Sequence, residues 1–467
     1  MTHEAPVDEK ATKNKTRIEH DSMGGMAVPE DAFYGAQTAR AIENFPVSDL
    51  RLQRPFIRAL GLIKAAAAHV NGSHAWLAPD VAAAIRRAAM EVAEGHHDHH
   101  FAVDVFQTGS GTSTNMNANE VIAHLASREL GRPVHPNDDV NRGQSSNDVF
   151  PSAMHVAAVE TVMHRTLAGL DFVARELARK EREFHDIIKL GRTHLQDAVP
   201  MRLGQEFSGY TQQVRNSIGR ILKALDGMYE LPLGGTAVGT GLNAPEGFAA
   251  ETIAEVARVT QCPFVEARNH FEAQAAKDAA VCLSGALRGT AVALTKIAND
   301  IRWMGSGPRC GFGELKLPAV QPGSSIMPGK VNPVIAESLL MVCAQVIGYD
   351  TTIAWCGAAG NFELNVMMPV MAYDLIESAQ ILGMAARNFA HRLVSGLDAD
   401  RERTTGFVEQ SLAMGTALAP EIGYEKAATL VKNAYLTGRT VREVAIEQSG
   451  LSPERINELL DPETQAG

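Results

Sequence analysis

The sequence predicts an all-α protein built around a bundle of long helices, and three observations support this class. Apolar residues recur at steps of three and four, as between Phe56 and Val70, which places them on one helical face. Runs in which Val, Ile or Thr alternate with polar residues are almost absent, so long strands are not expected. The chain has 467 residues, of which 45% are hydrophobic, enough to bury a large core in two or three domains.

The longest predicted helix covers residues 152–190, which contain no proline and a single glycine, Gly169. As one helix of about 39 residues it would span about 58 Å at 1.5 Å per residue. Comparable helices are expected at 201–229, 265–303, 333–355 and 361–394. Because such helices can bury their apolar stripes only along one another, the pattern predicts a central five-helix bundle.

Three helical parts and a tail are expected along the chain. Residues 1–16 mix acidic and basic side chains and lack the apolar core of a signal peptide, so they are interpreted as a flexible, solvated tail. Residues 17–144 are expected to form a smaller N-terminal helical domain. The five-helix bundle is placed at 145–397 and a small C-terminal helical domain at 398–467.

Composition excludes several classes of protein. The formal net charge is −11 and there is no basic block, which argues against a nucleic-acid or anionic-membrane partner. The five cysteines are scattered without a Cys-x-x-Cys pair, so reduced thiols and a cytoplasmic location are expected. No apolar run approaches the roughly 18 residues of a membrane span. The nearest, Leu62–Val70, is interrupted by Lys64.

Three polar loops lead directly into predicted helices, at 108–115, 144–148 and 323–333. The free N–H groups and positive dipole at a helix start favour an anion, although Ser, Thr and Asn there are often only caps. The third loop combines flexible glycines with two serines, Lys330 and Asn332, which is more chemistry than a turn requires. A phosphate-binding loop does not fit, because its glycine spacing is one residue too long and Val331 replaces the metal-binding hydroxyl.

Histidines supply two further candidates. His194 lies in a polar connection, where Glu337, in the first turn of a later helix, could orient and charge its imidazole. A separate tract, 96–100, contains four histidines that could ligate a metal at helical spacing. No carboxylate or cysteine partner with ligand spacing accompanies that tract, so it is interpreted as a solvated helix end and no metal site is predicted.

The stretch Gly-Ser-Ser-Ile-Met-Pro-Gly-Lys-Val-Asn at 323–332 closely resembles the shared motif of the fumarase/aspartase superfamily, and within it the class II fumarases are the nearest match. Further similar stretches follow in the family's order at 109–112, 135–141, 144–148, 193–197 and 360–365. The resemblance implies an all-α fold in three domains and a homotetramer with a twenty-helix core. It also implies active sites formed by loops of three subunits, without a metal or organic cofactor.

The implied reaction is the reversible, stereospecific addition of water to the small dicarboxylate fumarate, giving L-malate in the tricarboxylic acid cycle. Ser324 would be the base and His194, aided by Glu337, would act through water on the departing hydroxyl. Lys330 and Asn332 would hold the aci-carboxylate. The implied substrate-binding residues are Ser110, Gly111, Thr112, Ser145, Ser146, Asn147, Thr193, Ser325, Lys330, Val331 and Asn332. A second dicarboxylate site would comprise Arg132, His135, Pro136, Asn137 and Asp138.

Two other functions are weighed against this one. Stretches 40–45, 198–201 and 350–352 resemble aspartate ammonia-lyase, which forms fumarate and ammonia from L-aspartate. His194 argues against that enzyme, which generally has glutamine there. A non-catalytic structural role would tolerate loss of Ser324, His194 or Lys330, yet all three are present.

Overall fold

The computed structural model describes residues 15–466, and it confirms the all-α class. Two compact units are formed from interleaved stretches of the chain. The first unit contains the residues up to His164 together with Ile221–Ala286 and Gly348–Gln380. The second unit contains Arg165–Arg220, Leu287–Ile347 and the residues from Ile381 onward. Helices α7 (Leu203–Leu225), α10 (Asp278–Met304), α11 (Val334–Gly357) and α12 (Met368–Arg392) contribute to both units.

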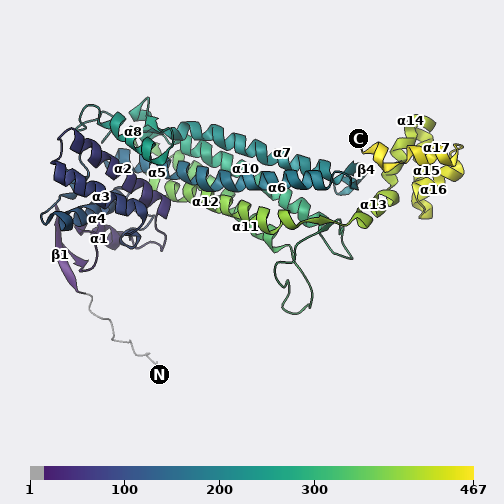
Figure 1. The fold of residues 1–467 in the computed structure, drawn as a ribbon, viewed down its shortest axis with the longest axis horizontal. Coiled ribbons are helices and arrows are strands. Elements are labelled where there is room, and N and C mark those ends of the chain that lie inside the picture. The colour runs from purple at the N-terminus through teal and green to yellow at the C-terminus, as the bar shows by residue number, and fades with distance from the viewer. Residues whose placement is uncertain (1–14, 467) are drawn as a thin grey trace, which may run out of the picture. The chain divides into compact units, whose positions relative to one another are not determined.

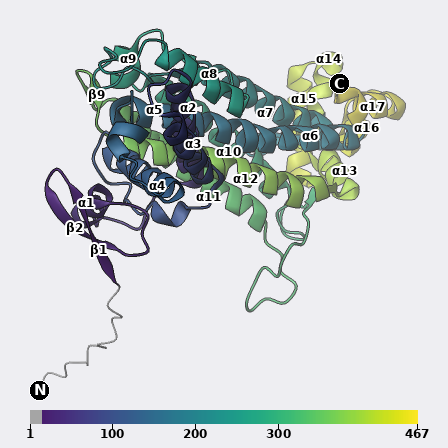
Figure 2. The same cartoon turned by 60° about the vertical axis from the view of Figure 1, so that its left-hand side comes forward.

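The first unit begins with a hairpin of β1 (Thr16–Asp21) and β2 (Gly24–Pro29), beside α1 (Ala36–Asn44) and α4 (Thr112–Leu130) (Figure 2). Its other main helices are α2 (Arg54–Ser73), α3 (Pro79–Glu94), α5 (Ser146–Thr161) and α8 (Phe248–Thr260). The short elements are η1 (Asp98–His100), the π-helical turn η2 (Pro136–Val140), η4 (Asp226–Tyr229), α9 (His270–Ala275), the parallel pair β5 (Glu230–Leu231) and β6 (Val265–Glu266), and the hairpin β8 (Gly360–Asn361) with β9 (Leu364–Asn365).

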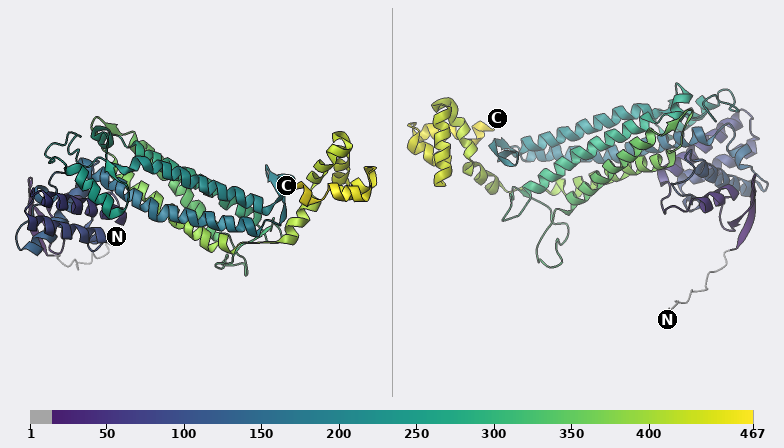
Figure 3. Two further views of the ribbon diagram at one scale, coloured as in Figure 1. Left: turned by 45° about the horizontal axis from the view of Figure 1, so that its top comes forward. Right: turned by 180° about the vertical axis from the view of Figure 1, so that it is seen from behind.

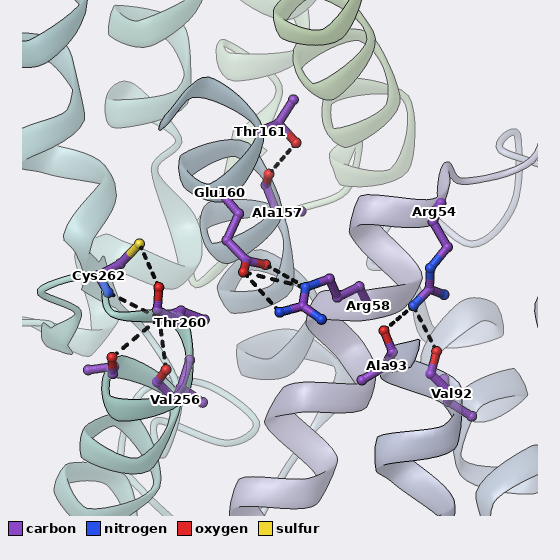
Figure 4. Close-up of polar contacts among 11 residues, drawn as sticks. Arg54, Arg58, Val92, Ala93, Ala157, Glu160, Thr161, Val256, Thr260 and Cys262 are labelled. Atoms are coloured by element: carbon purple, nitrogen blue, oxygen red, sulfur yellow. Dashed lines mark hydrogen bonds and ion pairs between the residues drawn. The ribbon is translucent and has the colours of Figure 1, made fainter. Parts of the chain in front are cut away.

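Helix α2 is the centre of the first unit and packs on α3, α5 and α8. Its approach to α3 is so close that a Cβ at Gly61 would lie 2.6 Å from the backbone N of Ala93. Two arginines on α2 tie it to its neighbours (Figure 4). Arg54 donates to the carbonyls of Val92 and Ala93, which terminate α3, and Arg58 pairs with Glu160 of α5 at 3.2 Å. These contacts fix the position of α2 relative to α3 and α5.

The second unit contains α6 (Leu167–Glu183) and parts of α7, α10, α11 and α12, which run side by side (Figures 1 and 3). A Cβ at Gly169 would lie 2.3 Å from the carbonyl O of Gly383, so α6 and α12 nearly touch there. The remaining elements are β3 (Ile188–Thr193), β4 (Gln196–Arg202), β7 (Leu315–Lys316), η5 (Val394–Gly396), β10 (Asp398–Ala399), α13 (Arg401–Gln410), η6 (Leu412–Leu418), α14 (Ala419–Ile422), α15 (Tyr424–Thr437), α16 (Val441–Gln448), α17 (Pro453–Leu459) and α18 (Pro462–Gln465).

The predicted helix at 152–190 is wrong at its end. A helical path through α5, the π-helical turn η3 (Val162–Thr166) and α6 stops at Glu183, and β3 begins at Ile188. Strand β3 pairs with β4, and Leu190 packs in the core formed by the C-terminal helices. Similarly, the segment predicted as one helix at 265–303 is broken between α9 and α10. At the first break, the pairing of β3 with β4 overrides the local apolar periodicity.

Helices α10 and α11 are long and apolar enough to cross a membrane by length and composition alone, which differs from the expectation that no apolar run approaches that length. The core helix of a soluble protein meets the same test. The most apolar window of α10 is 50% buried and that of α11 is 33% buried. The helices therefore retain exposed apolar side chains, among them Val292, Met341 and Trp355.

His155 on α5 is buried, and its Nδ1–H donates to the carbonyl oxygens of Met228 and Glu230 at 3.2 and 3.0 Å. Burial, with a smaller contribution from the charge of Lys277, lowers the pKa of His155 to about 4. Between about pH 6.5 and 4 the unfolded chain therefore takes up a proton that the folded chain does not. Stability from this group is complete above pH 6.5 and is lost as the pH falls, by up to about 3 kcal/mol.

A His155→Gln variant keeps an N–H donor but cannot titrate. We expect its free energy of unfolding to fall less than that of the wild type between pH 7 and 4.5, by about 1.4 kcal/mol per pH unit within the titration window. Urea unfolding of both proteins at several pH values measures this difference. Identical pH dependence in the two proteins would contradict the assignment.

Candidate active site

The serine-rich loop of the second unit is closed at its base. Gly323 N–H donates to the carbonyl of Lys330 at 2.7 Å, and the side-chain amide of Asn332 donates to the carbonyl of Gly323 at 2.5 Å. A Cβ at Gly323 would lie 2.5 Å from the Lys330 oxygen, so this close contact requires glycine. The two hydrogen bonds bring both ends of the loop together just before α11.

Within this loop, the hydroxyl oxygen of Ser324 accepts two backbone hydrogen bonds, from Ile326 N–H at 3.2 Å and Met327 N–H at 3.0 Å. Two donors aimed at one oxygen stabilise negative charge on it. Ser324 is half-buried, whereas Ser325, Lys330 and Val331 are exposed on the same loop. The loop therefore combines a serine oxygen that accepts two N–H groups with an accessible lysine.

His194 lies at the tip of the β3–β4 hairpin, and not in an irregular connection that follows a helix. His194 and Leu195 both have positive φ angles, +57° and +60°, as in a two-residue turn that matches strand twist. Such angles are unfavourable for leucine, so the surrounding structure must hold the turn. Thr193 and His194 are both exposed there. The turn presents the imidazole to solvent on a defined backbone.

Arg192, next to this turn, anchors the hairpin. Its guanidinium donates to Glu314 at 2.8 Å, and the Glu314 side chain is fully buried. The same guanidinium lies over the ring of Phe312, 4.4 Å from the centroid, and near that of Phe407 at 5.7 Å. A planar, charged group between two rings and a carboxylate can adopt few other positions. This anchor fixes the base of the His194 turn.

Glu337 lies in the first turn of α11, where its N–H donates to the carbonyl of Pro333 at 3.1 Å. Among residues 15–466, no hydrogen bond or ion pair joins Glu337 to His194, so their contact stays a prediction. Glu337 is half-buried.

The first unit holds the two other polar loops. Gly111, at φ +75°, precedes α4, and a Cβ there would lie 2.0 Å from the Phe150 ring. A Cβ at Gly109 would lie 1.7 Å from the carbonyl oxygen of Val366. These glycines allow the loop backbone to contact Phe150 and Val366 closely. The hydroxyls of Ser110 and Thr112 are 2.9 Å apart at the start of α4, so both lie where a helix favours an anion.

The loop before α5 forms a capping box: Ser145 Oγ accepts from Asn147 N–H, and Ser145 N–H donates to Asp148 at 2.9 Å. The Ser146 hydroxyl accepts from the side-chain amide of Asn115 at 3.1 Å. Asn147 donates to the carbonyl of Ala237 at 2.8 Å. Each predicted residue of this loop is thus held by a named partner.

Sequence reasoning missed a buried polar network behind these loops. Lys64, fully buried on α2, donates to the side-chain oxygens of Asn141 and Gln144 at 2.9 and 3.0 Å. Burial lowers the pKa of Lys64 to about 7, partly opposed by the charge of Asp148, and burial raises the pKa of Asp148 to about 6. The available signal was a lysine on an otherwise apolar helix face.

The five residues of the predicted second dicarboxylate site separate into two groups. His135, Pro136 and Asn137 line a cavity of about 720 Å³, together with Arg17, His20 and His124 among others. Arg132 does not line this cavity but pairs with Asp80 at 2.5 Å, and Asp138 is exposed, 3.3 Å from the His135 ring.

The prediction that the histidine tract 96–100 is a solvated helix end is wrong for His100. His100 is buried, and its ring stacks on Phe33 with centroids 4.1 Å apart. The His124 ring also stacks on Phe33, with centroids 4.8 Å apart. Within residues 15–466, no group of three or more His, Cys, Asp or Glu side chains is arranged to hold a metal ion.

The predicted residues therefore fall into two groups, one on each unit. Those on the first unit are Ser110, Gly111, Thr112, Ser145, Ser146 and Asn147. Those on the second unit are Thr193, His194, Ser324, Ser325, Lys330, Val331, Asn332 and Glu337. All five cysteines are free thiols, in agreement with their scattered spacing.

Comparisons with known proteins identify lyases and fumarate hydratases along most of the chain. Residues 24–348 match the family model described as "Lyase", and residues 415–465 match "Fumarase C C-terminus". The chain is 51% identical to mitochondrial fumarate hydratase of Rattus norvegicus, over 98% of this chain and 92% of the relative. It is 52% identical to class II fumarate hydratase of Mycobacterium tuberculosis (strain ATCC 25618 / H37Rv), over 94% and 93% of the two chains.

The fold agrees as well. The crystal structure of class II fumarase from Schistosoma mansoni matches with a TM-score of 0.94 and 40% sequence identity, covering 97% of this chain and 99% of the other. Similarity of this extent spans both units and every polar loop described above. The chain therefore belongs to the class II fumarate hydratase family.

Proposed function

We propose that the protein catalyses the reversible hydration of fumarate to L-malate, the step of the tricarboxylic acid cycle for which its relatives are named. The observation that carries this proposal is the Ser324 hydroxyl, which accepts two backbone N–H groups inside the closed loop. An isolated serine hydroxyl is a poor base. Donors that stabilise its alkoxide lower the cost of losing the hydroxyl proton, so that the oxygen can act as a base, and Lys330 adds positive charge on the same loop.

In the dehydration direction, Ser324, in its alkoxide form, takes the proton from C3 of L-malate and becomes a neutral hydroxyl. The electron pair moves into the neighbouring carboxylate, which becomes an aci-carboxylate dianion, and Lys330 and Asn332 hold this charge. That electron pair then forms the C2–C3 double bond as the C2–O bond breaks. The hydroxyl leaves as water after it receives a proton, through a water molecule, from His194, which Glu337 holds in its charged form. Preorganised donors are most effective where charge develops. In this proposal, the loop 323–332 therefore stabilises the transition state more than the bound substrate.

The substrate carboxylates bind at the starts of α4 and α5 in this proposal. Ser110, Gly111 and Thr112 supply one group of donors, and Ser145, Ser146 and Asn147 the other. Thr193, Ser325 and Val331 complete the pocket. Helix N-termini offer free N–H groups and a positive dipole, which suits a dicarboxylate on a protein of net charge −11.

We infer that each site is completed by loops of three subunits in a homotetramer. Glu337 and His194 do not hydrogen bond within the described part of one chain, so their proposed pairing calls for a second copy. Exposed apolar side chains along the bundle helices support such assembly: Val292, Met341 and Met384 are 55%, 69% and 60% exposed. Association of bundles would bury these faces in a twenty-helix core.

A second dicarboxylate site and a cytoplasmic location complete the proposal. His135 and Asn137, on the wall of the 720 Å³ cavity, would bind the second dicarboxylate together with Pro136, Arg132 and Asp138. Five free thiols are consistent with a reducing compartment.

The test is a direct assay with purified protein. Fumarate is supplied with and without ammonium, loss of its ultraviolet absorbance is followed, and the product is identified by chiral chromatography. We expect L-malate in plain buffer and no dependence on ammonium. L-Aspartate formed only with ammonium would replace the hydratase by an ammonia-lyase, and no reaction in either buffer would reject both activities.

A further inference from the structure

Lys64 lies on α2, the helix at the centre of the first unit, and has no exposed surface. The positions around it on the same helix, such as Leu60, Ile63 and Ala67, are also buried and are all apolar. An amine in such surroundings is costly unless its N–H groups are all well used. An apolar residue would pack at this position at less cost, so the bonds made by the amine are the feature to explain.

Those bonds lead to the proposed substrate loop. Lys64 Nζ donates to Asn141 Oδ1 at 2.9 Å and to Gln144 Oε1 at 3.0 Å. The same Asn141 oxygen accepts from the side-chain amides of Asn115 and Asn119, at 3.2 and 3.1 Å. Asn115 in turn donates to Ser146 Oγ at 3.1 Å. Asn141 and Asn115 therefore connect the amine to Ser146, a proposed substrate-binding residue. The amine also bonds directly to Gln144, the residue before Ser145.

Asp148 holds the opposite side of this loop. Its buried carboxylate accepts from Ser145 N–H, from Gly234 N–H and from Thr236 N–H, at 2.9, 2.9 and 3.0 Å. Asn141 also donates to the main-chain carbonyl of Gln144 at 3.1 Å. The segment 144–148 is thus held by a buried cation at its beginning and a buried anion at its end.

We propose that Lys64 is a positioning residue for the substrate loop 144–147, which it holds through Asn141 and Gln144 so that Ser145, Ser146 and Asn147 meet a substrate carboxylate. This inference rests on the proposed function. Lys64 does not touch the substrate in this scheme. Its loss would weaken binding of the substrate and the transition state alike, which raises KM with little change in kcat.

The test compares Lys64→Met with Lys64→Gln and a matched control. Methionine fills the space but donates nothing, whereas glutamine restores one amide donor. We expect Lys64→Met to raise KM for fumarate and for L-malate about tenfold or more, with kcat within about threefold of wild type. Lys64→Gln is expected to recover part of the lost affinity.

Lys180 provides the control, because it is also a buried lysine but donates to Glu183 and to the carbonyl of Leu397 in the second unit. Lys180→Met should lower the urea midpoint and leave KM within about twofold of wild type. Size-exclusion chromatography identifies variants that fail to assemble, and Lys64→Gln carries the test if Lys64→Met does not fold.

The possible results separate the two proposals. An active wild type with an unchanged KM in both Lys64 variants would overturn the positioning role alone. An equal rise in KM in Lys180→Met would also overturn it, since general destabilisation would then account for the effect. A wild type inactive toward fumarate and L-malate would overturn the proposed function and the inference with it.

Discussion

Replacing Ser324 with alanine is expected to lower kcat/KM for fumarate by about 10²–10⁴-fold, the usual contribution of a positioned acid or base. The substitution removes the proposed proton acceptor and leaves the N–H groups of Ile326 and Met327 without it. Those two residues are exposed, so solvent can satisfy the amides and the fold should survive. Steady-state kinetics in both directions measure the loss, and circular dichroism confirms the helical content.

Ser306 offers a matched control in the same unit. Its hydroxyl accepts a backbone N–H from Phe312 at 3.0 Å, as Ser324 accepts from its own loop, but it lies outside the motif 323–332. Ser306→Ala should therefore retain activity within about threefold of wild type. Near-normal turnover by Ser324→Ala, or an equal loss in Ser306→Ala, would show that another group removes the proton.

Arg192→Met is expected to destabilise the protein by about 3–5 kcal/mol, the usual cost of removing one partner of a buried ion pair. The Glu314 side chain is fully buried, and among residues 15–466 its second oxygen, Oε1, has no hydrogen-bond partner. Removing the guanidinium would strand that carboxylate and also remove the contacts with Phe312 and Phe407. Urea unfolding gives the free energy, and activity should fall because His194 loses its anchor.

A double variant distinguishes the stranded charge from lost packing. Arg192→Met combined with Glu314→Gln should recover part of the lost stability, since the uncompensated carboxylate is gone. Arg192→Lys should keep the charge yet lose the planar contact with the rings, which places it between wild type and Arg192→Met. A cost below about 1 kcal/mol for Arg192→Met would contradict the importance of this pair.

The sequence alone predicted the helical class and all three polar loops, because these depend on local properties. Apolar spacing marks helices, and Ser, Thr, Asn and Gly mark their starts. The roles of Ser324 and His194 came from family resemblance and not from spacing. The hydrogen bonds that would activate Ser324 became visible only with the loop geometry.

The β3–β4 hairpin could not be predicted, because its alternation is interrupted where the register shifts between Leu190 and Arg192. Its apolar residues also continued the helical spacing of the preceding segment. The Lys64 network could not be predicted for a related reason. Its partners are separated from it by about 80 positions in sequence, and nothing local distinguishes a lysine that interrupts a buried face from one that bonds to Asn141 and Gln144.

The closed base of the serine loop also determines how far a disturbance can spread. Gly323 is hydrogen-bonded to both Lys330 and Asn332, so the two ends of the loop are held together. The segment between them can therefore be ordered at little entropic cost to α11. The exposed side chains of Ile326 and Met327 can therefore be replaced while their backbone N–H groups stay bonded to Ser324. Variation is thus confined to exposed side chains of the loop, while the backbone geometry that the proposed chemistry at Ser324 requires is kept.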